Sequence, residues 1–395
     1  MFKRFITLLI GWLLAINSNA QKTVSEADAV NMALKNSSNI SAGGLSILQQ
    51  KQLLKSTFNL PNPEVFIESP TGNFYTGSIT QSIEFPTVYG KQYQLQKQKV
   101  VLAEKEKFVV ETEVKLQVKQ FYLLLQYAMA LQQQLFVQDT VYERISIAGS
   151  RQFDAGQIDY LQKTVAESQY GDVHNQYIQS QITIANLQSQ LQYLTGLREN
   201  FMVIPLNKNP LINNNIFTDS TVFNANPSLQ IVNQNTIISQ KNIDLQNAKS
   251  LPGLAIGYFN QGERSTPISN RFRFGFTIPL WFGQYKSNIA AAKTEFNINQ
   301  QKANGLQQQL SIQLLQAQNE LAVYTQSIQY YQATGLKKAK DIINTSKRLF
   351  ENGQNDYINY MRNNNDAYSI QLKYLEAIRN YNLSVLSIQY LTGTL

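Results

Sequence analysis

The chain has 395 residues, of which 43% are hydrophobic and 15% charged, with a formal net charge of +8 and no cysteine. The absence of cysteine excludes disulfides, thiol catalysis and thiolate metal sites. The basic residues are scattered among acidic ones, and even the densest run, 97–107, is typical of a solvated helix face, so the charge does not indicate a nucleic-acid partner.

The N-terminus has the pattern of a secretory signal peptide. Lys3 and Arg4 precede an apolar run at 5–16, and the small residue Ala20 suits cleavage before Gln21. The apolar run is about a dozen residues, shorter than the ~20 needed to span a bilayer. We therefore predict that residues 1–20 are removed and that the mature chain is exported.

The first half of the mature chain predicts helices followed by two strands. Ser25 is the expected N-cap of the first helix, and a second helix over 45–58 ends before Pro61. Apolar and polar residues then alternate at about 64–68 and 78–85, a period of two that predicts a strand hairpin. We expect this hairpin to end at the segment 86–90.

The second half repeats this order. A helix of about 25 residues ends before Pro252, and strands are predicted at about 254–260 and 270–278. A proline-to-glycine segment at 279–283 closes this hairpin, as 86–90 closes the first.

A long helical hairpin follows the strands in each half. The segments at about 91–149 and 284–344 are continuously helical in pattern, with apolar residues stepping by four and three. A returning helix with a similar seam follows each of them. A 60-residue helix would be about 90 Å long, far longer than the helices of a globular domain.

The turn between the two long helices occurs twice in nearly the same sequence. Residues 151–160 align with 348–357 at an offset of 197, and the same offset brings 192–196 onto the identical 389–393. This register indicates a tandem duplication. We therefore divide the chain into a first repeat at 21–200, a linker at 201–225 and a second repeat at 226–395.

The hairpin tips, expected near 149–160 and 346–357, share four residues with distinct predicted roles. The glycine allows the chain to reverse, the aspartate caps the returning helix, and the phenylalanine packs at the end of the seam. The pattern fits residues that only form a turn, and it fits a docking surface. These residues are Arg151, Phe153, Gly156 and Asp159, with their copies Arg348, Phe350, Gly353 and Asp356.

Four strands are too few to close a barrel, which needs about eight. An open sheet would expose its edge backbone groups, so we expect the chain to assemble with copies of itself. The last strand has an apolar face beside arginine and threonine, which favours a shared barrel with a lipid-facing exterior over the alternative of an ordinary sandwich core. Its lipid-facing residues would be Phe272, Phe274, Phe276 and Ile278.

The duplicated layout of helix, strand hairpin, long helix, Arg-x-Phe-x-x-Gly turn and returning helix resembles the TolC-like outer-membrane efflux proteins, the outer membrane factors of tripartite efflux and type I secretion systems. The resemblance covers essentially the whole mature chain. It implies a mainly α fold with a small β part, in which a homotrimer forms a 12-stranded β-barrel in the outer membrane and a long α-barrel that crosses the periplasm.

The resemblance also implies partners and a function. The tips would meet a periplasmic membrane-fusion adaptor on an inner-membrane pump, and the channel would passively conduct substrate to the exterior. Some family members place carboxylates just beyond the tip, at the closed entrance. In this chain Asn359, Arg362 and Asn363 occupy that region, so we expect them to line an entrance closed by neutral hydrogen bonds.

Other functions are less well supported. A periplasmic coiled-coil adaptor would carry one hairpin rather than two, and a secreted helical scaffold or adhesin would not explain the phenylalanine-rich strand. No enzyme, cofactor or metal site is expected, because the chain lacks a glycine-rich phosphate loop and its one histidine, His174, is predicted to be a surface residue. The sequence leaves the substrate open between a metal cation, a drug and a polypeptide.

Overall fold

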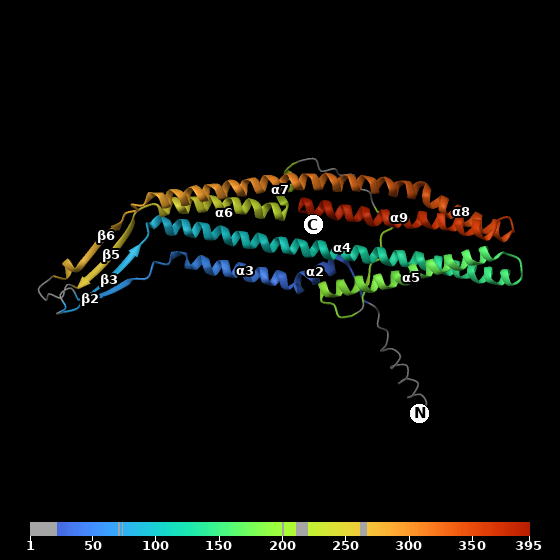
Figure 1. Ribbon diagram of the computed structural model, residues 1–395, viewed down its shortest axis with the longest axis horizontal. Coiled ribbons are helices and arrows are strands. Elements are labelled where there is room, and N and C mark those ends of the chain that lie inside the picture. The colour runs from blue at the N-terminus through green and yellow to red at the C-terminus, as the bar shows by residue number, and fades with distance from the viewer. Residues whose placement is uncertain (1–21, 70–71, 73, 200, 211–219, 261–266) are drawn as a thin grey trace, which may run out of the picture.

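The computed structural model describes residues 22–69, 72, 74–199, 201–210, 220–260 and 267–395. The predicted signal peptide at 1–20 lies outside these residues. Figure 1 shows an elongated molecule with a β-sheet at one end and the turns of two helical hairpins at the other. The fold is mainly helical, as predicted.

Long helices make up most of the molecule, and the strands are short. The helices are α2 (Glu26–Asn36), α3 (Ser38–Lys55), α4 (Pro86–Asp154), α5 (Tyr160–Thr195), α6 (Pro227–Lys249), α7 (Phe282–Tyr330), α8 (Leu336–Glu351) and α9 (Tyr357–Thr392). The strands are β1 (Lys22–Val24), β2 (Glu64–Glu68), β3 (Thr76–Ile83), β4 (Phe201–Val203), β5 (Gly253–Asn260) and β6 (Phe272–Thr277).

The helix starts differ in part from the prediction. Ser25 caps α2 as expected, but the predicted helix at 45–58 begins earlier because the Ser37 side chain caps α3 by accepting from the Ile40 N–H. The segment 86–90 is the first turn of α4 rather than a loop. Pro86 fits there because a helix leaves its first N–H groups without an internal partner.

Helix α4 contains 69 residues and is therefore about 100 Å long. Its counterpart was predicted as one helix at 284–344, but it is interrupted between α7 and α8 by a π-helical turn, Tyr331–Gly335. The Leu336 N–H bonds to the Tyr331 carbonyl, five residues back. Glycine suits this turn, because a Cβ at Gly335 would lie 2.9 Å from Cδ1 of Tyr331.

The main sheet has the order β2-β3-β5-β6, with every neighbouring pair antiparallel. Strand β3 ends earlier than the predicted 78–85 because the Glu84 N–H bonds to the Tyr89 hydroxyl instead of a strand. Strand β6 is shorter than the predicted 270–278. A 3₁₀ turn, Ile268–Arg271, precedes it, and its last pair joins Thr277 to Gly253.

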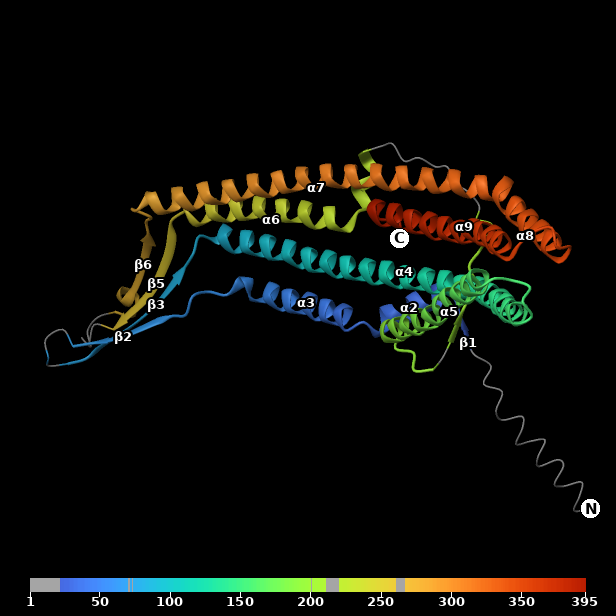
Figure 2. The ribbon, with the colours of Figure 1, turned by 45° about the vertical axis from the view of Figure 1, so that its right-hand side comes forward.

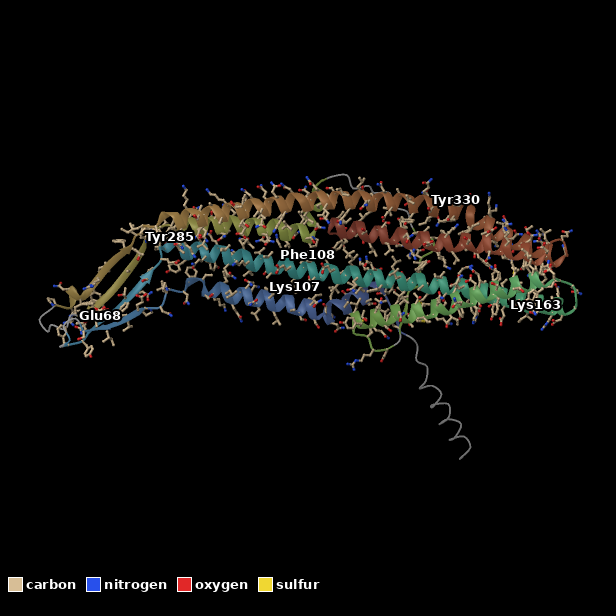
Figure 3. All side chains as sticks on the ribbon, in the orientation of Figure 1. Glu68, Lys107, Phe108, Lys163, Tyr285 and Tyr330 are labelled. Carbon is tan, nitrogen blue, oxygen red and sulfur yellow. The ribbon has the colours of Figure 1, made fainter. Side chains whose placement is uncertain are left out.

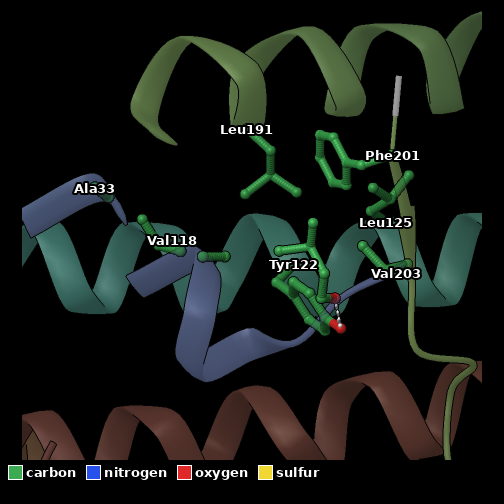
Figure 4. Close-up of a cluster of buried hydrophobic side chains, with 9 residues drawn as sticks. Ala33, Val118, Tyr122, Leu125, Leu191, Phe201 and Val203 are labelled. Atoms are coloured by element: carbon green, nitrogen blue, oxygen red, sulfur yellow. Dashed lines mark hydrogen bonds between the residues drawn. The ribbon is translucent and has the colours of Figure 1, made fainter. Parts of the chain in front are cut away.

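A second, two-stranded sheet was not predicted. Strand β4 lies inside the segment predicted as a linker at 201–225, and it pairs in parallel with β1, which Figure 2 shows beside α5. Figure 4 shows the hydrophobic cluster beside them, to which Tyr122 of α4 belongs together with Phe201 and Val203 of β4. The Tyr122 hydroxyl donates to the Val24 carbonyl and accepts from the Ile204 N–H, both at 2.9 Å.

We predict that Tyr122→Phe lowers the free energy of unfolding by about 1–3 kcal/mol, because it leaves the buried Val24 carbonyl and the partly buried Ile204 N–H without the hydroxyl that bonds both. Thermal unfolding followed by circular dichroism measures this loss. Tyr193→Phe is the matched control, since the Tyr193 side chain is 87% exposed. Equal stability of the two variants would contradict the structural role of the Tyr122 hydroxyl.

The helices pack side by side in the order of the strands. Near the sheet the order is α3-α4-α6-α7, and near the hairpin tips it is α5-α4-α9-α8. The molecule therefore has two flanks. We call the flank with β2, α3 and α5 the α5 flank, and the flank with β6, α7 and α8 the α8 flank.

Candidate functional site

The hairpin tips are the first candidate site, and both have the same backbone. In the first tip, the Gly156 N–H bonds to the Phe153 carbonyl at 2.9 Å and the Gln157 N–H bonds to the Gln152 carbonyl at 2.8 Å. This is a Schellman motif. Its copy is at Gly353, and the φ angles of the two glycines are +70° and +68°. A Cβ would meet nothing within 4 Å at either position, so backbone conformation, not space, explains the glycines.

The two predicted aspartate caps are present. An Asp159 oxygen accepts from the Gln162 N–H at 2.7 Å, and the Gln162 side chain accepts in return from the Asp159 N–H. An Asp356 oxygen accepts from the Asn359 N–H at 2.7 Å, and the Asn359 side chain donates to the other Asp356 oxygen. Asn359, predicted to line the entrance, is thus part of a helix cap.

The two repeated phenylalanines pack within their own tips. The Phe350 ring stacks on Tyr360 at 4.5 Å, and the Phe153 ring lies 6.1 Å from Tyr160 and 5.0 Å from the Lys163 ammonium. Figure 3 marks Lys163 at this end of the molecule. Both phenylalanines are half-buried, so they shape the tips more than they present a surface.

The residues after each turn differ in exposure, which the matching sequence did not predict. Tyr160 and Leu161 of the first tip are 69% and 62% exposed, whereas Tyr357 of the second tip is only 4% exposed. Tyr357 packs into a hydrophobic cluster that joins the two hairpins. The first tip therefore presents an apolar pair to solvent.

A tyrosine and two amides connect the hairpins. The Tyr142 hydroxyl of α4 donates to the Asn365 side-chain oxygen, and the Asn365 amide donates to the Gln169 side chain of α5, each at 2.8 Å. Burial raises the pKa of Tyr142, and burial raises the pKa of Tyr368 to about 12, so both stay protonated at physiological pH. Only the apolar period gave a signal for these residues, and it did not indicate which hairpins they join.

The other residues predicted to line an entrance lie on different faces. Asn363 is half-buried and donates to the Ser346 hydroxyl at 3.4 Å, within its own hairpin. Arg362 is exposed and has no ion pair with any described residue. The arginines of the repeated motif, Arg151 and Arg348, are also exposed.

The main sheet is the second candidate site, and its register separates an apolar face from a polar one. One row across the four strands contains Val65, Ile79, Tyr258 and Phe272. The adjacent row, on the other face, contains Glu64, Thr80, Gly257 and Arg273. The apolar row continues along β6, where Phe274 is 79% and Phe276 71% exposed, and Ile278 beyond the strand is 62% exposed.

The described part of the chain offers no candidate metal site. No group of three or more His, Asp or Glu side chains suited to a metal ion occurs there. His174 is exposed, and its Nδ1 lies 3.0 Å from an Asp139 oxygen. No helix among the described residues has an apolar stretch long enough to cross a membrane.

Comparisons with known proteins are consistent with this geometry. Residues 220–394 match the family model described as "Outer membrane efflux protein". No curated protein matches the sequence.

Solved structures match nearly the whole chain. A structure of CusC, described in terms of folding and transmembrane channel formation, aligns with a TM-score of 0.76 at 15% identity, covering 93% of this chain and 92% of CusC. The CmeC outer membrane channel of Campylobacter jejuni aligns with a TM-score of 0.77 at 15% identity, covering 93% and 85%. The outer membrane protein VceC of Vibrio cholerae aligns with a TM-score of 0.74 at 11% identity, covering 93% and 96%. These matches establish the fold.

Proposed function

We propose that the chain belongs to the outer membrane efflux protein family, whose model matches residues 220–394, and that it is the outer-membrane channel subunit of a tripartite efflux system. The protein is not an enzyme. It passively conducts substrate from the periplasm to the exterior, and it lies in the outer membrane with its long helices extending into the periplasm.

One observation carries this function most directly: among the described residues, a sheet with one apolar face and two free edges lies at the end of a helical body that contains a helix about 100 Å long. Within the described residues, β2 and β6 each pair on one side only. Free edges are unstable in lipid because their backbone groups lack partners. A sheet that is apolar outside and polar inside is stable in a membrane once its edges are joined, because its backbone groups are then paired and its apolar side chains face the lipid.

We propose that three copies join these edges. Strand β6 of one copy would pair with β2 of the next, and three copies would supply the twelve strands of a closed barrel. Phe272, Phe274, Phe276 and Ile278 would then face the outer-membrane lipid. The polar row at Thr80 and Arg273 would face the lumen.

The hairpin tips are the proposed docking site for a periplasmic membrane-fusion adaptor, which links the channel to an inner-membrane pump. The tips lie at the end opposite the sheet. The exposed pair Tyr160 and Leu161 adds apolar surface beside the predicted docking residues Arg151, Phe153, Gly156, Asp159, Arg348, Phe350, Gly353 and Asp356. The exposed Arg362 is the strongest candidate to line the entrance, with Asn359 and Asn363 beside it.

Membrane fractionation tests the proposed function. We expect the full chain, expressed in a Gram-negative cell, to sediment with the outer membrane and to be released by detergent but not by high salt or carbonate. Membrane insertion by an apolar face explains this result, since salt and carbonate remove proteins held only by charge. Recovery in the soluble periplasmic fraction would contradict the proposal.

A further inference from the structure

The ends of the two hairpins carry opposite net charges, although they descend from one repeat. The first hairpin end, 139–176, contains six acidic and three basic residues, a net charge of −3 with His174 neutral. The second hairpin end, 336–373, matches it residue for residue at the offset of 197, and it contains four acidic and seven basic residues, a net charge of +3. Glu143 and Arg144 correspond to Lys340 and Asp341, so both signs are reversed at adjacent positions.

The excess positive charge is concentrated on α8. Lys337, Lys338 and Lys340 are all exposed, and none of them forms an ion pair or a hydrogen bond with the described residues. On the same helix, the Lys347 ammonium lies 3.8 Å from a Glu351 oxygen, and both side chains are about 60% exposed, so this pair is weak.

The excess negative charge lies on the first hairpin. Glu143, Glu167 and Asp172 are exposed. Glu167 has a long contact of 3.8 Å to Lys163 and accepts a hydrogen bond from the neutral Ser150 hydroxyl, and Asp172 accepts one from the neutral Gln176 side chain. The first hairpin end therefore also has charge that no partner within the chain neutralises.

These two charged surfaces do not meet within one chain. Helix α8 packs on α9, helix α5 packs on α4, and the order α5-α4-α9-α8 places α8 and α5 on opposite flanks. The contact between the two hairpins uses α4, α5 and α9, and it is made by the tyrosines and amides around Tyr142 and Asn365. None of the ion pairs among the described residues joins the two hairpin ends.

We propose that the lysine face of α8 in one copy binds the acidic face of α5 in the next copy. The inference rests on the proposed trimer, because joining β6 to β2 of a neighbour brings the α8 flank of one copy against the α5 flank of another. The new element is which two surfaces of neighbouring copies meet and that opposite charges hold them together. Copies related by rotation in a closed ring are not shifted along the rotation axis. Residues of neighbouring copies therefore meet only when they lie at the same distance from the hairpin tips along that axis.

The lysine face of α8 and the acidic face of α5 lie at the same distance from the hairpin tips. His174 of α5 contacts Asp139 of α4 at 3.0 Å, and position 139 corresponds to 336, next to Lys337. Asp172 therefore lies about as far from the tips as Lys337. Likewise, Glu167 accepts from the Ser150 hydroxyl at 3.3 Å, and Ser150 corresponds to Lys347.

The two kinds of contact between hairpins would then differ in strength. The contact within a chain buries Tyr142 and Tyr357, whereas the contact between copies depends on exposed charges. Exposed ion pairs weaken with salt, because the screening length falls from about 10 Å at 0.1 M to about 3 Å at 1 M. The contact between copies is accordingly the one that separates more easily.

Cysteine cross-linking tests the proposal, and the natural chain has no cysteine to interfere. Lys337→Cys with Asp172→Cys is expected to give covalent dimers and trimers on non-reducing gels after mild oxidation of the assembled protein in outer membranes. Gln169→Cys with Asn365→Cys is the control, because these side chains are hydrogen-bonded at 2.8 Å within one chain and should give no covalent multimers.

Charge reversal in the same cysteine background isolates the electrostatic contribution. Lys338→Glu with Lys340→Glu should slow cross-linking at low salt by at least about threefold, and 1 M salt should slow the parent to a similar extent. Adding Glu167→Lys, on the acidic face of α5, should restore much of the rate. A mass measurement on the same samples reports the trimer independently.

Two results would overturn this inference and leave the proposed function intact. One is a trimer by mass that gives no covalent multimers, and the other is a cross-linking rate that changes neither with charge reversal nor with salt. A particle of one chain would overturn both.

Discussion

Replacing Phe274 and Phe276 with arginine is expected to abolish recovery of the protein in the outer membrane. Both side chains are more than 70% exposed, so packing within the chain does not require them. On the lipid face of a membrane sheet, each arginine costs about 2–4 kcal/mol near the bilayer midplane. Immunoblotting of fractionated membranes measures the outcome, and a parallel blot of total protein separates failed insertion from failed expression.

The control places the same charge on the other face of the sheet. Ser78→Arg with Ser82→Arg lies on the polar face, because Ser78 and Ser82 are each two residues from Thr80 along β3 and share its side of the sheet. This variant should reach the outer membrane at close to the natural level. Equal recovery of the two double variants would contradict the assignment of an outer, lipid-facing side.

Tryptophan at both tip glycines, Gly156→Trp with Gly353→Trp, is expected to leave the assembled channel intact and to abolish export. The left-handed backbone at each glycine costs about 1–2 kcal/mol for any other residue. A side chain there would point into open space, so the added bulk obstructs an incoming partner rather than the fold. Accumulation of the pump's substrate in cells that lack the natural chain measures export.

Gly156→Ala with Gly353→Ala separates bulk from backbone strain. Alanine imposes a similar conformational penalty but adds only one methyl group, so this variant should retain most of the export. If the tryptophan variant transports normally, the tips are only turns. If the alanine and tryptophan double variants lose export equally, backbone strain in the turn explains the loss and obstruction of a docking partner does not.

Short-range signals predicted much of the structure. Alternation of phenylalanine with polar residues located β6, and a glycine followed three residues later by an aspartate predicted both the turn and the helix cap at each tip. These signals work because a strand's period and a cap's hydrogen bond are set by a few neighbouring residues.

Contacts between distant segments were harder to predict. The β1–β4 pair joins residues about 180 positions apart, and the Tyr142–Asn365 bond joins two repeats, so neither leaves a local pattern. The π turn at Tyr331 was missed because its residues continue the apolar seam of a helix. The different exposure of Tyr160 and Tyr357 also depends on the neighbouring hairpin rather than on the repeated sequence.

The proposed channel requires that identical copies complete the sheet, since β2 and β6 have free edges in the described part of a single chain. The mass of the detergent-extracted particle, corrected for bound detergent by light scattering with refractive-index and absorbance detection, tests it most directly. We expect a protein mass of three mature chains. A stable particle with the mass of one chain would contradict it.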